Sequence, residues 1–307
     1  MRKLTVSLLV VLCVAMWSAA WAQYNPPVDR NANGIGYFMV EVPNPSAMVI
    51  DGSDADWAWF PEEYKITMDQ LVSEQGAPLP DPSDMEISAM LGWSPPPDNM
   101  WYVFSAVHDD TLDIESTDPN NPWSDDCLEM AFDPTDHGRG DTREYGQCYT
   151  IKAETFISPP YPIWTTHVTT VPEAWQEMCR PPYAEGYVAT NPPDARNYPI
   201  WTSDTGVDIY YEFKMAVWDH SLEDGPVSSP RTILHAGQVL PFCLWWEDGD
   251  GGWKYDITVR SNTAAAISGG VSYFATSTLL SLEDVGIPRE VAVESNTWGA
   301  LKATFQE

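Results

Sequence analysis

The chain has 307 residues, of which 45 are acidic and 15 basic, and its formal net charge is −30. So negative a chain is repelled by nucleic acids and by anionic membranes, which excludes proteins that bind either by charge. Its content of hydrophobic residues is 44%, enough to form a real core, so the composition also excludes a disordered chain.

Residues 1–22 have the pattern of an export signal. Arg2 and Lys3 precede the apolar run VSLLVVLCVAM at 6–16, which is too short for a membrane span, and small residues end the segment at Ala22. Cleavage there leaves 13 basic and 45 acidic residues, for a net charge of −32. We expect a protein exported to the periplasm or the extracellular space, without membrane insertion.

From residue 37 onward, short strand-like segments alternate with turn clusters. Most of these segments alternate in polarity, are rich in aromatic and β-branched residues, and are bounded by Pro, Gly, Asp or Asn. The predicted strands are residues 37–42, 86–93, 100–109, 127–133, 147–154, 207–218, 239–248 and 255–260. Because helical periodicity is rare, the pattern predicts an all-β fold with two packed antiparallel sheets, a β-sandwich.

The sandwich is expected to span residues 37–285, between an N-terminal loop at 23–36 and a C-terminal tail at 286–307. Residues 157–204 contain the sequences SPPYP, RPPY and NPPD. Since proline is excluded from central strands, this segment is predicted to be a long inserted surface loop.

The stretch NPWSDDCLEMAFDP, residues 121–134, combines an indole ring with a carboxylate. In its strand, Leu128 and Met130 share the core face and Glu129 points to the other face, because side chains alternate. Trp123 lies on a turn just upstream. Sugar rings stack on flat aromatic faces and their hydroxyls need polar partners, so this pair is a candidate sugar site. Alternatively, Trp123 only caps the core at an edge turn.

Several motifs, in order, resemble family 9 carbohydrate-binding modules and their DOMON-like relatives. They are VIDGSDADWAW, GWSPPPDNMWYVFSAVHDD, the NPW-to-Glu129 stretch, YYEFKMAVW and PFCLWWEDGDG. The resemblance covers roughly residues 48–282. It implies a non-catalytic, jelly-roll or immunoglobulin-like sandwich that binds polysaccharide or oligosaccharide, is often appended to secreted glycosidases, and can carry structural calcium.

The resemblance also implies site residues. Trp123 stands where the family has one of two Trp rings that clamp a glucose unit, and Glu129 where a carboxylate accepts hydrogen bonds from sugar hydroxyls. A family Arg falls at about Tyr149, and the second clamping Trp falls in AISGGVSYF, residues 266–274, which has no Trp. Trp245 lies on the strand face equivalent to that of Glu129 and is a candidate replacement. The alternative is that Trp245 packs under the insertion.

Two further features concern calcium and disulfides. The acidic hairpin EDGDGG offers Asp248 and Asp250 as calcium ligands, although an ordinary Gly-rich turn uses the same residues. Four cysteines follow the signal, which in an exported chain predicts up to two disulfides. A hairpin turning near residue 138 would pair Cys127 with Cys148, and pairings that use Cys243 remain open.

Two other classes of function compete with sugar binding. Some DOMON-like domains hold haem b between Met and His ligands, which makes an electron-transfer domain the first alternative. A surface scaffold without a small ligand is the second. An enzyme is not expected, because G-x-S-x-G, H-E-x-x-H and P-loop motifs are absent. The candidate haem ligands are Met90, Met130, Met215, His108 and His220.

Overall fold

The computed structural model describes residues 34–73, 76–115, 124–134, 147–152, 180–219, 224–250, 254–259 and 274–288. The strands are β1 (Tyr37–Glu41), β2 (Ile66–Thr67), β3 (Leu71–Ser73), β4 (Met85–Trp93), β5 (Trp101–Asp113), β6 (Cys127–Phe132), β7 (Gln147–Lys152), β8 (Ala184–Asn191), β9 (Ile200–Met215), β10 (Val239–Asp248), β11 (Tyr255–Val259) and β12 (Ala275–Leu280). The helical segments of this part of the chain are short 3-10 turns: η2 (Pro45–Ala47), η3 (Asp54–Trp57), η4 (Glu62–Tyr64), η5 (Met68–Gln70) and η8 (Ala195–Asn197).

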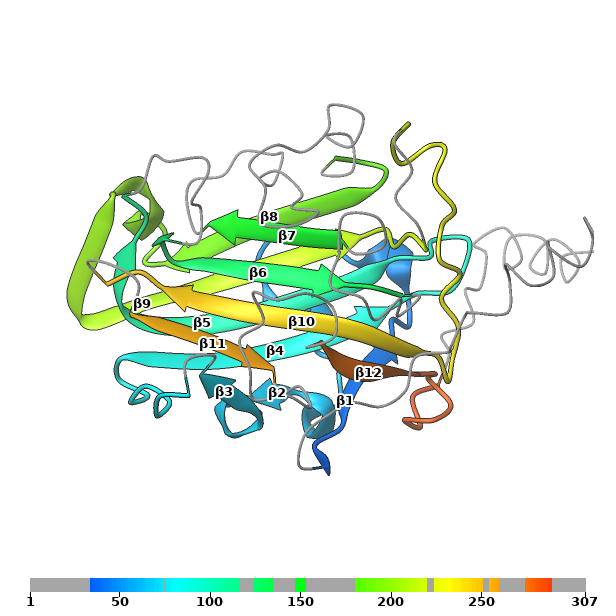
Figure 1. Cartoon of the computed structure of the whole chain (residues 1–307), viewed down its shortest axis with the longest axis horizontal. Helices are drawn as coiled ribbons and strands as arrows, with labels where there is room; N and C mark the ends of the chain where they lie inside the picture. The colour runs from blue at the N-terminus through cyan, green and yellow to red at the C-terminus, as the bar shows by residue number, and fades with distance from the viewer. Residues whose placement is uncertain are drawn as a thin grey trace, which may run out of the picture.

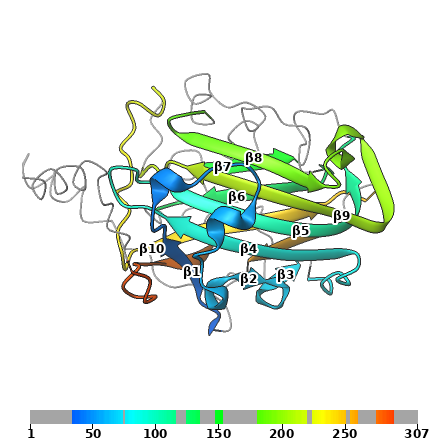
Figure 2. The ribbon, with the colours of Figure 1, turned by 180° about the vertical axis from the view of Figure 1, so that it is seen from behind.

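The strands form a sandwich of two layers that lie face to face, which confirms the predicted fold class (Figures 1 and 2). In the first layer β6 lies between β7 and β10, and the other edge of β10 carries β11 and β12, with β3 beyond β11. In the second layer the order is β4-β5-β9-β8, with β2 beside β4. All of these pairings are antiparallel.

β1 departs from the predicted antiparallel pattern. It runs parallel to β12 of the first layer and parallel to β4 of the second, so it joins both layers into one continuous sheet. Eight strands match the sequence prediction, and β2, β3, β8 and β12 were not predicted.

The core lies between the inner faces of the layers. Leu128 and Met130 of β6 are fully buried there, as their alternation with Glu129 predicts. Trp246 of β10 is also fully buried, and its Nε1 donates a hydrogen bond of 2.8 Å to Oγ of Ser105 on β5. This bond joins the two layers and satisfies the one polar atom of the indole inside the core.

The IDG motif is held in place by a buried carboxylate of the second layer. Glu212 of β9 accepts hydrogen bonds from the backbone N–H groups of Asp51 and Gly52 and from Nε1 of Trp57, each at 2.9 Å. Burial raises the pKa of Glu212, and these three hydrogen bonds oppose that rise. The motif therefore serves to fasten residues 51–60 onto the outer face of this layer.

Part of the predicted insertion is regular structure. Within residues 157–204, β8 pairs along its whole length with β9 and forms the edge of the second layer, and β9 itself begins at Ile200. The prediction of a loop was wrong here because the two prolines of RPPY and those of NPPD flank β8 rather than interrupt it, and an edge strand tolerates proline at its ends. Residues 157–179 lie outside the described residues.

The predicted disulfide between Cys127 and Cys148 is wrong. In the β6–β7 hairpin Cys127 stands opposite Lys152, and Cys148 stands opposite Ala131. The cysteines are four residues out of register, about 13 Å along the strands, whereas a disulfide needs Cα atoms within about 7 Å. Cys127 is a buried free thiol. The prediction placed the centre of the hairpin two residues too early.

Replacement of Gly52 by Ala tests the attachment of the IDG motif. Gly52 has φ +78°, and a Cβ atom there would lie 2.7 Å from Cβ of Ala189. Gly52→Ala should therefore cost about 2 kcal/mol or more, from left-handed backbone strain and overpacking together. Gly237→Ala is the matched control, because φ is +77° there and nothing lies within 4 Å. It should cost only about 1 kcal/mol in chemical denaturation. Equal costs would contradict the packing role.

Candidate functional site

Glu129 stands in the middle of a polar row on the outer face of the first layer. The register of β10, β6 and β7 places Trp245, Glu129 and Thr150 side by side. Oγ1 of Thr150 donates a hydrogen bond of 2.5 Å to Oε1 of Glu129, and Glu129 itself is half-buried. The carboxylate is therefore held by a hydrogen bond, and Glu129 lies on the same face as Trp245, as the sequence predicts.

Trp245 forms an apolar wall of this row. Its side chain is 7% exposed, and Phe274 packs against it edge to face with ring centroids 6.2 Å apart. Phe274 is the last residue of the segment 266–274, where the family resemblance places the second clamping Trp. The register thus places Trp245 next to Glu129, with Phe274 packed against Trp245 and little of the Trp245 ring accessible to a ligand.

The other two predicted sugar-binding residues fare differently. Trp123 lies outside the described residues. Tyr149 faces the core: it stands opposite Met130 in the hairpin and is 1% exposed. The prediction for Tyr149 is therefore corrected, because strand alternation makes Thr150 and Lys152 the residues of β7 that share the face of Glu129.

Lys152 is the cation of this face that the sequence analysis missed. It is 5% exposed and forms an ion pair with Asp125, which is 1% exposed. It stands opposite Cys127, one row away from Glu129 on the same face. The signal was available in the sequence, since Lys152 lies two residues after Thr150 in an alternating strand.

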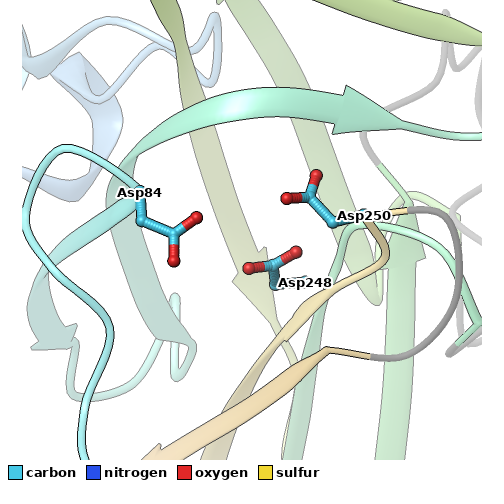
Figure 3. A group of neighbouring side chains, drawn as sticks. All are labelled: Asp84, Asp248 and Asp250. Carbon is cyan, nitrogen blue, oxygen red and sulfur yellow. The ribbon is translucent and has the colours of Figure 1, made fainter.

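A second group of functional side chains gathers where β5, β10 and the start of β6 meet. Its members form three triads, and within each triad one oxygen from every carboxylate lies within 4.8 Å of the others. The triads are Asp84 with Asp248 and Asp250, Asp109 with Asp126 and Asp248, and Asp109 with Asp110 and Asp250. Figure 3 shows the first triad, with the carboxylates of Asp84 and Asp250 on either side of Asp248. We call these six carboxylates the acidic centre.

Several oxygens of the acidic centre are buried without a hydrogen bond of normal geometry. They are both carboxylate oxygens of Asp248, Oδ2 of Asp109 and Oδ1 of Asp250. Asp126, by contrast, accepts bonds from the backbone N–H groups of Asp113 at 2.6 Å and Gly249 at 2.7 Å. Asp126 thus links the end of β5 and the end of β10 to the start of β6. The oxygens of Asp109, Asp248 and Asp250 named above have no such hydrogen bond.

Burial and mutual repulsion raise the pKa values of Asp109, Asp126 and Asp248 in the acidic centre. Desolvation, with the charge of Asp248 next in importance, raises the pKa of Asp109 to about 8. Desolvation and the charge of Asp250 raise the pKa of Asp248 to about 7. The pKa of Asp126 is also raised, mainly by burial and then by Asp109. A bound cation would remove the repulsion and allow these groups to ionise.

The acidic centre fits calcium. Calcium takes oxygen ligands at about 2.3–2.6 Å, so two ligands on opposite sides of the ion lie about 5 Å apart. The triads meet this spacing, and the unsatisfied buried oxygens supply the ligand type that calcium prefers. Asp248 and Asp250, the ligands that the sequence suggested, are joined by Asp84, Asp109, Asp110 and Asp126, which the sequence analysis did not identify.

The candidate haem ligands do not converge in the described part of the chain. Met130 and Met215 are fully packed in the core between the layers. His108 lies on the outer face of β5, where its Nδ1 is 2.8 Å from Oδ1 of Asp208. His220 lies outside the described residues. In the same part of the chain, none of the helices has the length and hydrophobicity that crossing a bilayer requires.

Comparisons with known proteins bear on the fold. No family model matches the sequence, and no curated protein does. Among solved structures, a family 9 carbohydrate-binding module from Caldicellulosiruptor kristjanssonii in complex with cellotriose has a TM-score of 0.50 at 15% identity, covering 83% of this chain and 98% of that one. The module in complex with glucose has a TM-score of 0.48 at 14% identity, covering 80% and 95%. This chain therefore has the fold of a family 9 carbohydrate-binding module.

Proposed function

We propose that the chain is an exported, non-catalytic carbohydrate-binding protein. The observation that carries the proposal is the orientation of Glu129 by Thr150 beside Trp245, on the outer face of a fold shared with modules that bind glucose and cellotriose. A carboxylate fixed in this way accepts hydrogen bonds from sugar hydroxyls without losing side-chain entropy on binding. The ligand is a neutral oligosaccharide or a polysaccharide chain end, and secreted glycosidases are the expected partners.

In this proposal each residue of the face has a distinct task. Glu129 accepts hydrogen bonds from sugar hydroxyls, and Trp123 stacks on the sugar ring. Trp245 and Phe274 supply the apolar wall against which the ring packs. Lys152 holds Asp125 and balances part of the negative charge of the face. No step of bond cleavage is assigned to any of these groups.

We also propose that calcium binds the acidic centre as a structural ion. Asp109, Asp126 and Asp248 are the most buried members, and they form the triad whose members are all buried. The ion supplies positive charge there, which allows carboxylates from β5, from β10 and from the segment before β6 to remain ionised in contact. Its effect is to hold one end of the sandwich together.

Glu129→Gln tests the sugar site. The amide keeps the shape of the side chain but loses charge-assisted hydrogen bonds, each worth about 1.5–3 kcal/mol, so affinity for cellotriose should fall roughly tenfold or more. Isothermal titration calorimetry measures this. Glu185→Gln is the control, because Glu185 is an exposed carboxylate on the edge of the other layer. If both variants bind alike, Glu129 is not the ligand-binding carboxylate.

Trp123→Ala tests the stacking ring. Loss of an aromatic anchor should cost on the order of 2 kcal/mol or more of binding free energy while the melting temperature changes by only a few degrees. Tyr198→Ala, which removes an aromatic ring that is 48% exposed at another position, serves as the control in the same glycan-array and calorimetric assays. A variant that unfolds but retains sugar binding would identify Trp123 as a core residue.

The calcium site predicts a pH-dependent effect on stability. Asp109 and Asp248 have folded-state pKa values of about 8 and 7, above the value of about 3.9 for unfolded Asp, so the calcium-free protein should lose stability progressively as pH rises from about 4 to about 8. Calcium replaces these protons, so it should raise the melting temperature more at pH 8.5 than at pH 5.5. At a concentration of 100 times Kd it should add about 2.7 kcal/mol.

Thermal unfolding in chelator and in calcium measures this effect. Asp248→Asn should remove the calcium response, whereas Asp81→Asn, a change at an exposed carboxylate outside the acidic centre, should leave it intact. An equal response to calcium in both variants would show that the ion binds elsewhere.

A further inference from the structure

The acidic centre already contains one cation of the protein's own. Nζ of Lys254 lies 2.6 Å from Oδ1 of Asp84 and 2.5 Å from Oδ2 of Asp250. Its backbone N–H donates to the carbonyl of Asp248 at 2.9 Å, and its ammonium lies 5.4 Å from the centre of the Tyr255 ring. Lys254 is thus held at its backbone and at the ammonium end of its side chain.

The ammonium stays charged in this position. Nζ of Lys254 donates hydrogen bonds to the carboxylates of Asp84 and Asp250, and two carboxylates in contact favour the charged form of the amine. The two carboxylates it contacts flank Asp248 in the triad drawn in Figure 3.

The distances from Nζ of Lys254 to the carboxylate oxygens show that the ammonium occupies the position of a metal ion. A calcium–oxygen bond is about 2.3–2.6 Å long, and the two Nζ–oxygen distances are 2.6 and 2.5 Å. A calcium ion that bridged the same oxygens of Asp84 and Asp250 would stand where Nζ stands. The ammonium and a divalent ion cannot share this position.

The opposite side of the acidic centre has no such group in the described residues. Asp109, Asp126 and Asp248 form an entirely buried triad, and the side-chain ion pairs of Lys254 end at Asp84 and Asp250. Asp248, which is fully buried, and Asp109 direct unsatisfied oxygens into this triad. The two sides share Asp248 but differ in whether a cation is already supplied.

We propose that Lys254 is a built-in counter-ion that occupies the Asp84–Asp250 side of the acidic centre, so that the protein binds a single divalent ion, on the side of Asp109, Asp126 and Asp248. This inference rests on the proposed calcium site. It makes Lys254 the residue that determines the stoichiometry of metal binding: without its ammonium, the carboxylates of Asp84 and Asp250 become the ligands of a second ion.

The test is the number of calcium ions bound by the full chain, counted by native mass spectrometry and by calorimetry. The wild-type protein should bind one ion at this centre, and Lys254→Met, which keeps an unbranched apolar side chain without the ammonium group, should bind two. Lys254→Arg should bind one, because it restores the charge. Lys214→Met is the matched control, since Lys214 pairs with Glu185 at 2.8 Å in the other layer, and it should also bind one.

A double variant locates the additional ion. Asp84→Asn combined with Lys254→Met should return the count from two to one, because Asp84 belongs only to the side that Lys254 occupies. All proteins are purified in calcium, and circular dichroism verifies that each is folded before ions are counted. If Lys254→Met does not fold in calcium, Lys254→Gln takes its place in both variants.

Each outcome decides between the two proposals. A wild-type protein that binds no calcium removes the proposed calcium site and this inference with it. One ion in both the wild type and Lys254→Met leaves the calcium site standing but overturns the role of Lys254. Two ions in the wild type, or none in the folded Lys254→Met variant, also overturn it, the latter because Lys254 would then help to organise the metal site rather than fill part of it.

Discussion

Neutralising the charge of six carboxylates at one end of the sandwich is the constraint on which the rest of the structure depends. The acidic centre lies where both layers meet, and the carboxylate of Asp126 links Asp113 to Gly249 by accepting a hydrogen bond from the backbone N–H of each. Burial raises the pKa of Asp109, Asp126 and Asp248, and the repulsion between ionised carboxylates this close adds to that rise, so these three favour a proton or a bound cation. Lys254 supplies one positive charge, and the proposed calcium ion supplies the remainder of what the junction needs.

The sugar face depends on that junction through β6 and β10. Both strands have one end at the acidic centre, and Glu129 and Trp245 stand opposite each other farther along the same pair. A fixed junction keeps the two strands in register, which keeps the carboxylate beside its aromatic wall. On the opposite face of β6 and β10, core residues such as Met130 and Trp246 pack against the second layer.

Strand alternation explains both the successes and the failures of prediction at the sugar face. It assigned Glu129 to the outer face and Leu128 to the core correctly, because a strand buried on one side has an unambiguous period of two. The assignment of Tyr149 came from the position of a family residue instead, and it is off by one residue. In a strand, an error of one residue moves a side chain to the opposite face.

The sequence by itself determined the all-β class, eight of the strands and the outward direction of Glu129, because polarity alternation and turn residues are local signals. Only the tertiary structure decided which distant segments meet. The acidic centre draws Asp84, Asp109, Asp126 and Asp248 from separate parts of the chain, and the register of the β6–β7 hairpin separates Cys127 from Cys148. The tertiary structure also decided that β1 runs parallel to two partners and that β8, which lies between prolines, is an edge strand. Pairing between strands depends on long-range packing, which no local pattern encodes.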